Sequence, residues 1–165
     1  MPDQTGADRP EQETRRHARG MAVRREVLGD AHVDRAVENT TEFTEPFQDF
    51  ITRYAWGDLW GGDGVDRPTR SCLTLAILAA QGLEHEFAMH VRAALRNGVQ
   101  PGEIREVLMH VAVYAGVPRA NRGFALADEI LREHGHTASI SNADQGSNAD
   151  QGSNTEEGDG ADGRG

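Results

Sequence analysis

The chain has 165 residues and a formal net charge of −10, a size that fits one domain and a charge that argues against a nucleic-acid partner. About half of this charge lies in residues 141–165, so the rest of the chain is mildly acidic and can still bind an anion through local arginines. Cys72 is the only cysteine, which excludes an intrachain disulfide and a metal site built from several thiolates. No signal-peptide core or membrane-length apolar run is present, so we expect a cytoplasmic protein without a membrane partner.

Both ends of the chain are polar and predict no fixed structure. Residues 1–12 carry few apolar side chains, and we expect them to be disordered. In residues 135–165, the segment Asn142–Ser147 is repeated as Asn148–Ser153 and is followed by acids and glycines. Such a segment buries too little apolar surface to offset the entropy of ordering it. We therefore predict one domain over residues 13–134 and a disordered, acidic, low-complexity tail.

The first half of this domain predicts three helices. The first spans residues 13–28 and ends at Gly29, and Asp30 is expected to cap a short second helix. Thr44 is expected to cap the third helix, which has Pro46 in its first turn. The third helix carries apolar side chains on one face, which we expect to be buried: Phe47, Phe50, Ile51, Tyr54 and Ala55.

The second half predicts four more helices after a glycine-rich loop at residues 61–64. Asp66 is expected to cap a helix that ends at Gly82 and is apolar nearly all round, which predicts a place at the centre of the molecule. Further helices are predicted over residues 84–97, 101–115 and 118–134, each ended by glycine. No segment alternates apolar and polar residues convincingly, so the sequence predicts an all-α domain.

Glu86 and two histidines are the residues that point to chemistry. Glu86 lies four residues before His90, and therefore on the same helical face, where it can orient the imidazole. His90 falls at the edge of the apolar stripe of its helix, where a side chain can face a cleft. Each histidine alone fits equally well as a core residue that bonds a carbonyl group. The combination of Glu86, His90 and His110 favours an acid–base site.

His110 lies within the apolar run of residues 107–117, and Tyr114 follows it one turn later. A helix with apolar side chains on several sides needs more partners than a small monomer provides. We therefore expect a subunit interface around this helix, and a plain core helix is the alternative.

Other kinds of site fit the sequence less well. His85 and His90 are five residues apart and point in different directions, and no His-Glu-x-x-His pattern is present. Cys72 lies on an apolar helix without an obvious base, and no Gly-x-Ser-x-Gly elbow occurs. Four arginines flank the histidine helices and are candidates for binding a carboxylate ligand: Arg67, Arg70, Arg119 and Arg122.

Five segments give the chain a specific resemblance to a known family. They are residues 24–33, 47–60, 66–71, 90–99 and 110–118, and the resemblance extends over residues 21–132. These segments resemble the 4-carboxymuconolactone (γ-carboxymuconolactone) decarboxylases, which belong to the alkylhydroperoxidase D-like superfamily. The segment around Trp56-Gly57 and the last two segments are the most specific. The resemblance implies an all-helical, oligomeric fold.

The redox members of this superfamily carry the pattern Cys-x-x-Cys-x-x-x-His. Here Leu83 and Glu86 stand in the two cysteine positions, whereas His90 keeps the histidine position. Dithiol peroxidase chemistry is therefore excluded on this chain, which favours the decarboxylase branch.

What the resemblance implies is loss of CO2 from an anionic lactone to give β-ketoadipate enol-lactone in protocatechuate breakdown, without a metal or cofactor. The catalytic residues that we predict are Glu86, His90, His110 and Tyr114. The predicted substrate-binding residues are Arg70, Arg119 and Trp56, and the expected assembly is a homo-oligomer, either trimer or hexamer. Two alternatives remain: a related cofactor-free decarboxylase or isomerase acting on another lactone or β-keto acid, and a non-catalytic helical binding module.

Overall fold

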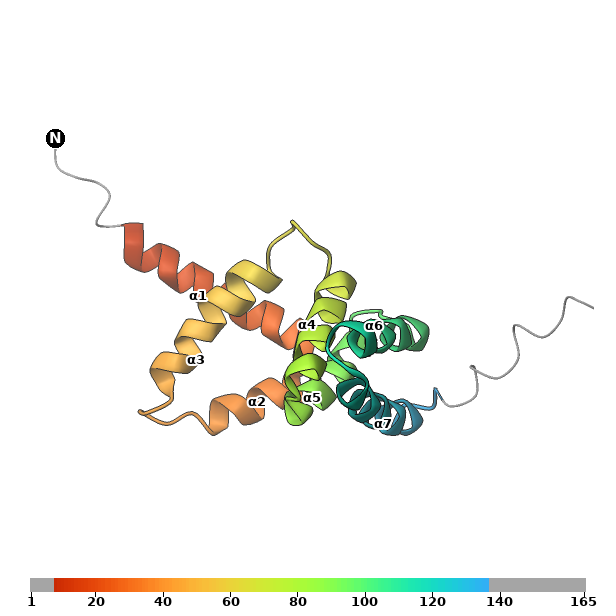
Figure 1. Ribbon diagram of the computed structural model, residues 1–165. Coiled ribbons are helices and arrows are strands. Elements are labelled where there is room, and N and C mark those ends of the chain that lie inside the picture. Colours follow the sequence, from red (N-terminus) through yellow and green to blue (C-terminus); the bar gives the residue numbers. More distant parts are fainter. Residues whose placement is uncertain (1–7, 137–165) are drawn as a thin grey trace, which may run out of the picture.

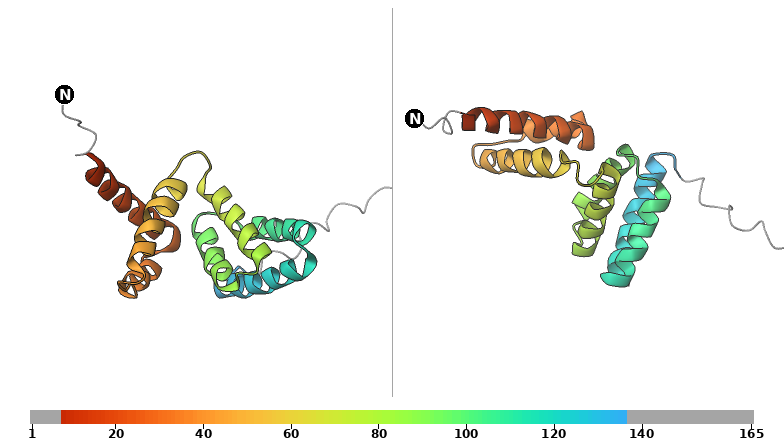
Figure 2. Two further views of the ribbon diagram at one scale, coloured as in Figure 1. Left: turned by 60° about the vertical axis from the view of Figure 1, so that its left-hand side comes forward. Right: turned by 90° about the horizontal axis from the view of Figure 1, so that it is seen from above.

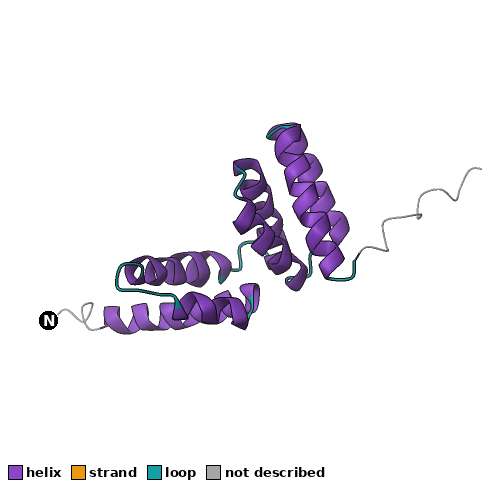
Figure 3. Ribbon diagram, turned by 90° about the horizontal axis from the view of Figure 1, so that it is seen from below, coloured by secondary structure: helices purple, strands orange, loops and turns teal. Residues whose placement is uncertain are grey.

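The computed structural model describes residues 8–136, in which all regular structure is helical (Figure 3), so the predicted all-α class is confirmed. Disorder was predicted for residues 1–12 and 135–165, and the parts of this prediction at 1–7 and 137–165 lie outside the described residues. The elements, labelled in part in Figure 1, are α1 (Asp8–Leu28), α2 (Asp30–Glu38), α3 (Glu45–Ile51), the π-helical η1 (Thr52–Trp60), α4 (Arg67–Gln81), α5 (Glu84–Arg96), α6 (Pro101–Tyr114) and α7 (Val117–Glu133).

The helices form two groups that meet at α5 (Figure 2). In the first group, α1 packs along η1 and contacts α2, whereas α4, α5, α6 and α7 form a bundle. Each group has its own core, and α5 contributes to both: Phe87 and Val91 pack in the bundle, whereas Ala93 packs with the first group. None of the helices within residues 8–136 is long and apolar enough to cross a membrane.

The first group depends on a close approach between α1 and η1. A Cβ atom at Gly20 would overlap the backbone oxygen of Thr52 and would lie 3.1 Å from the backbone nitrogen of Gly57. Trp56 and Trp60 are buried on the same side of η1. Small residues therefore let the two backbones meet, and the two indoles fill the space beside the contact.

The apolar face predicted for residues 47–55 is not buried in the single chain. Phe47, Phe50 and Tyr54 are all exposed, and the side of η1 that packs on α1 carries Thr52 and Trp56 instead. The change from α to π geometry at residue 52 shifts the side-chain period before Tyr54, whereas Phe47 and Phe50 lie on α3, which has no buried residue. The prediction of the helix was correct. The prediction of its buried face was wrong for Phe47, Phe50 and Tyr54, whereas Ala55 packs against the core of the first group.

The predicted central position of α4 was also wrong. Ser71, Leu75 and Ala79 are buried along one face, but Leu73 and Ile77 are exposed on the other. The helix packs on α5, α6 and α7, all from one side, so its second apolar face has no cover within the described chain.

Most helix ends follow the local signals in the sequence. The Asp66 carboxylate accepts a hydrogen bond from the Thr69 backbone N–H at 2.8 Å, and Gly82 ends α4 with a φ of 73°. Two predicted ends need correction. The first helix begins at Asp8 rather than near residue 13, and Gly29, with a φ of 87°, precedes α2 where Asp30 was expected as the cap.

Candidate active site

His90 lies on α5 where the two cores meet. Its neighbours Phe87 and Val91 face the bundle, whereas its own ring turns toward the first group and is half-buried. The imidazole stacks on the indole of Trp60, with ring centroids 6.2 Å apart and an interplanar angle of 19°. The contact joins residues thirty positions apart in the chain, so helical periodicity alone could not predict it.

The tryptophan predicted to bind substrate lies behind this contact. Trp56 is 7% exposed and stacks on Trp60, with ring centroids 5.5 Å apart. Trp60 is therefore the indole that contacts His90, and Trp56 supports it from the core. Trp60 was quoted in the sequence motif but was not assigned to the site.

The surroundings of His90 keep its imidazole uncharged at neutral pH. Burial, together with the positive charge of nearby His32, lowers the pKa of His90 from 6.5 to about 4, and the Glu86 carboxylate opposes this shift. Glu86 is exposed and is not joined to His90 by a hydrogen bond, so it acts on the imidazole through its charge. His32, from α2, is thus a neighbour of the site that was not among the predicted residues.

The low pKa of His90 predicts a pH-dependent stability. Between pH 6.5 and about 4, the unfolded chain binds a proton at this residue that the folded chain does not, so stability falls as the pH falls across that window. We expect the loss to be on the order of 2 kcal/mol. Urea unfolding of the wild type and of His90→Gln at several pH values isolates this contribution. Equal slopes of stability against pH for the two proteins would contradict the prediction.

His110 and Tyr114 lie in different surroundings, on the outer face of α6. Their rings contact each other, with centroids 4.6 Å apart, and Tyr114 is 78% exposed. Met109 and Val113 on the same helix are also exposed. In the single chain, His110 therefore faces solvent from a helix with an uncovered apolar surface, whereas His90 is half-buried beside Trp60.

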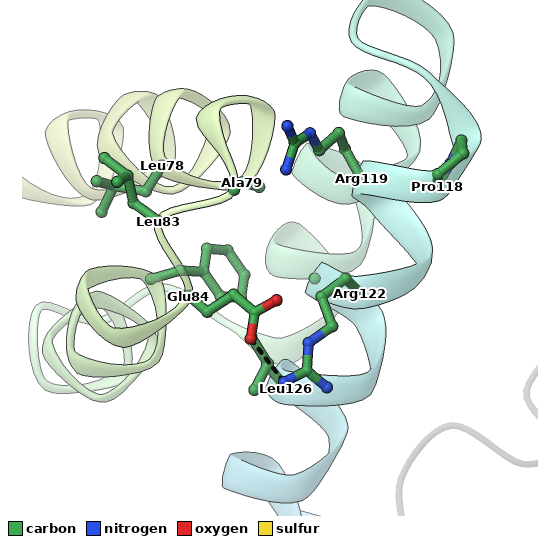
Figure 4. A pocket seen from close by; sticks show the side chains of 11 residues that line it. Leu78, Ala79, Leu83, Glu84, Pro118, Arg119, Arg122 and Leu126 are labelled. Carbon is green, nitrogen blue, oxygen red and sulfur yellow. Dashed lines mark hydrogen bonds and ion pairs between the residues drawn. The ribbon is translucent and has the colours of Figure 1, made fainter.

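Arg119 lines a small pocket of about 180 Å³ between the end of α4, the start of α5 and α7 (Figure 4). Its guanidinium packs against Gly82, where a Cβ atom would overlap it. In the same pocket, Arg122 donates a hydrogen bond to the Glu84 carboxylate at 2.6 Å, which lowers the pKa of Glu84. Arg122 is thus paired with Glu84 in an exposed ion pair, whereas Arg119 forms no ion pair with an acid of residues 8–136.

Arg70 lies at the other end of α4. Its guanidinium donates to the Gly62 backbone oxygen at 3.2 Å, and its Nε atom is buried without a hydrogen-bond partner. Twelve residues of helix separate Arg70 from Gly82, which corresponds to roughly 18 Å along the axis. Within one chain, the two arginines predicted to bind substrate therefore border different parts of the surface.

Within the described residues the protein is all-helical and holds a half-buried histidine that stacks on an indole. Comparison with known proteins identifies the family. The model of the carboxymuconolactone decarboxylase family matches residues 45–129. The 4-carboxymuconolactone decarboxylase of Acinetobacter baylyi is 43% identical over 129 residues, which are 78% of this chain and 96% of the relative. The nitrosuccinic acid decarboxylase of Metarhizium robertsii is 44% identical over 114 residues, which are 69% of this chain and 80% of the relative.

A 4-carboxymuconolactone decarboxylase of Pseudomonas putida is 56% identical over 46 residues, which are 28% of this chain and 96% of that sequence. The chain belongs to the carboxymuconolactone decarboxylase family. This membership confirms the resemblance drawn from the sequence motifs, and with it the alkylhydroperoxidase D-like fold class.

Proposed function

We propose that this chain converts 4-carboxymuconolactone into β-ketoadipate enol-lactone and CO2, without a metal or organic cofactor, in the breakdown of protocatechuate. The observation that carries the proposal is the 43% identity to the Acinetobacter baylyi 4-carboxymuconolactone decarboxylase, over 96% of that relative's length. The residues that we assign to the chemistry, His90 and His110, both lie within the matched part of the chain.

The substrate supplies its own electron sink. The carboxylate that leaves is attached to the γ carbon of an unsaturated lactone, so the electrons of the broken bond move through the ring alkene to the lactone carbonyl. The product of this step is CO2 and an oxyfuran-like dienolate. The dienolate then takes one proton at its α carbon. The protein must therefore stabilise the developing oxyanion and deliver a proton to carbon.

We assign proton delivery to His90, whose charge is influenced by Glu86, and oxyanion stabilisation to His110 with Tyr114. The stacking of His90 on Trp60 fixes the plane of its ring, which supports a role in directed proton transfer. The contact between His110 and Tyr114 places two hydrogen-bonding groups side by side on α6. Binding of the substrate carboxylates by Arg70 and Arg119 stays a prediction, which the KM values of Arg70→Gln and Arg119→Gln test.

A second candidate substrate is nitrosuccinic acid, because a decarboxylase named for it is 44% identical to this chain. Both candidates are acids that lose CO2, but only the lactone carries a ring alkene conjugated to a carbonyl. Purified full-length protein should be offered both compounds, with CO2 release and the ultraviolet absorbance of the lactone followed together. Turnover of the lactone with equal release of CO2 supports the proposal. Release of CO2 from nitrosuccinate alone would replace it with the second candidate.

We also propose that the chain acts as a homo-oligomer in which the outer face of α6 meets another copy. Contiguous exposed apolar surface of this kind marks protein contacts, and Val113 is 76% exposed in the single chain. Such a contact would also cover His110, which the single chain leaves in solvent. The mass of the particle in solution distinguishes three copies from six.

Val113→Asp is expected to dissociate this assembly, because it places a charge in an interface without a partner. Size-exclusion chromatography with light scattering measures the mass of the particle, and circular dichroism checks that the helices persist. Ala125→Asp, at an exposed position on α7, is the matched control and should leave the mass unchanged. An oligomer of unchanged mass in Val113→Asp would show that the α6 face is not the contact.

A further inference from the structure

A groove with a volume of about 480 Å³ lies between the α1–α2 turn and α5. This volume falls within the range of roughly 300–1,000 Å³ that is typical of small-molecule sites. The groove is unusually rich in nitrogen-bearing side chains. Its lining includes His32, Arg35, His85, Met89, Arg92 and Arg96.

The positive charge of this groove is only partly balanced by the protein. Arg92 pairs with Glu133 at 2.8 Å, and Asp30, the acid in the lining, accepts a hydrogen bond from Arg25 outside the groove. Arg35 and Arg96 make no ion pair with any acid of residues 8–136. Two guanidinium groups thus face an open groove without an anionic partner.

Arg96 is held in place by the backbone of the α1–α2 turn. Its Nη1 atom donates to the Val27 backbone oxygen at 3.3 Å, and its guanidinium carbon would lie 3.1 Å from a Cβ atom at Gly29. Gly29 has a φ of 87°, which favours glycine, and the absence of a side chain there also leaves room for the guanidinium of Arg96. The position of Arg96 is therefore set before any ligand arrives.

A buried cation outside the groove adds positive charge near His32. Arg24 is 6% exposed, donates to the neutral Gln48 side chain at 3.0 Å, and has an Nε atom without a partner. It lies near enough to His32 to lower the pKa of that histidine, together with burial, Arg35 and His85. A buried cation without an acid is destabilising unless an opposite charge lies nearby. Arg24 and Gln48 line a different hollow, so Arg24 adds to the positive potential near His32 without being a ligand of the groove.

We infer that this groove, in place of Arg70 and Arg119, binds the carboxylate that stays on the substrate when CO2 leaves, with Arg35 and Arg96 as its ligands. The inference rests on the proposed function. It assigns the groove to the retained carboxylate because an ion pair with the departing one would stabilise the ground state more than the transition state, in which that charge is being lost. Met89 lines the groove and packs against the core cluster that contains Trp60, so the groove borders the layer in which His90 stacks on Trp60.

The groove also connects the substrate to the proton donor. His32 lines the groove and is one cause of the low pKa of His90. An anion bound beside His32 favours protonation of the imidazoles near it, and the charge of Glu86 acts on His90 in the same direction, so the protonated form of His90 becomes more favourable. Substrate binding therefore favours the protonated form of His90, which delivers the proton, whereas His90 is uncharged in the free protein.

The test uses Arg35→Gln and Arg96→Gln in the full-length chain, with Arg15→Gln as control. Arg15 is exposed on α1 and pairs with Glu11 one turn away, so its replacement removes the same charge away from the groove and from the proposed α6 contact. We expect each groove variant to raise KM for the lactone about 10-fold or more while kcat changes little, because the contact is equally strong in ground and transition states. Arg70→Gln and Arg119→Gln are measured in the same series.

Direct binding separates this inference from the proposed function. Muconolactone carries the lactone ring and the retained carboxylate but lacks the one that leaves, and its Kd is measured by calorimetry. The Kd should rise about 10-fold or more in Arg35→Gln and Arg96→Gln and stay unchanged in Arg15→Gln. Unchanged Kd and KM in both groove variants would overturn the inference, as would losses confined to Arg70→Gln or Arg119→Gln. Absence of lactone turnover by the wild type, with muconolactone still bound through the groove, would overturn the proposed function instead.

Discussion

His90→Gln is expected to lower kcat for the carboxylated lactone by about 100-fold or more, the usual effect of losing a positioned general acid. Glutamine approximates the size and hydrogen-bonding capacity of the imidazole but cannot donate a proton to carbon. The half-buried position between two cores and the stacking on Trp60 make His90 the histidine whose geometry is fixed within one chain. Steady-state kinetics with the ultraviolet assay give the measurement.

The matched control is His134→Gln, because His134 lies past the end of α7 and its Nδ1 atom contacts the Ile130 backbone oxygen at 2.9 Å. It should keep wild-type turnover. A His90→Gln protein that assembles normally and keeps near wild-type kcat would remove His90 from the chemistry. His110→Gln belongs in the same series. A loss of kcat in that variant, with assembly intact, would show that both imidazoles serve the reaction.

Gly20→Ala is expected to destabilise the protein by about 3 kcal/mol or more, at the upper end of the range for overpacking. A methyl group there would overlap the backbone oxygen of Thr52, and backbone atoms cannot turn aside as a flexible side chain can. Separation of α1 from η1 would loosen the layer in which Trp60 supports His90, so activity should fall together with stability. Chemical denaturation followed by circular dichroism measures the change.

Gly102→Ala provides the matched control, because Gly102 is also helical but has no neighbour within 4 Å of its added methyl group. Alanine favours a helix over glycine by up to about 1 kcal/mol, so this variant should be unchanged or slightly more stable. The two substitutions are chemically identical and have opposite expected signs. Equal effects of the two would mean that the close contact at Gly20 is not what limits the size of that residue.

The helix ends were largely predictable from sequence, because each depends on residues next to it in the chain. Asp66 and Gly82 mark the two ends of α4 in the structure as they do in the sequence. Gly29 shows the limit of this reasoning, since a glycine with positive φ took the position expected for Asp30. Local signals locate a helix end to within a few residues, whereas the residue that occupies the cap depends on the turn before it.

Which helix faces are buried was much less predictable. The apolar residues of α3 and α4 were correctly placed on faces, yet Phe47 and Ile77 remain exposed in the single chain. A sequence pattern states that a face is apolar, and it does not state whether the same chain or a second copy covers it. The exposed face of α6 around Val113 is the case in which the sequence did indicate a second copy.

The candidate site was predictable only in part for a related reason. His90 could be singled out from its place on one helix, but its contact with Trp60 and the influence of His32 come from segments far away in the chain. The groove likewise combines Arg35 of α2 with Arg96 of α5. Its two halves meet only through the packing of α1 against α5, which helical periodicity does not reveal.

Conversion of the lactone in heavy water tests most directly whether the chain catalyses decarboxylation through a dienolate. Each molecule of lactone consumed should yield one CO2 and one enol-lactone that carries a single deuterium at the carbon α to the carbonyl, with no metal or cofactor added. Mass spectrometry and NMR of the product give both quantities in one experiment. Consumption of the lactone without CO2, or an enol-lactone with its deuterium at another carbon, would contradict this chemistry.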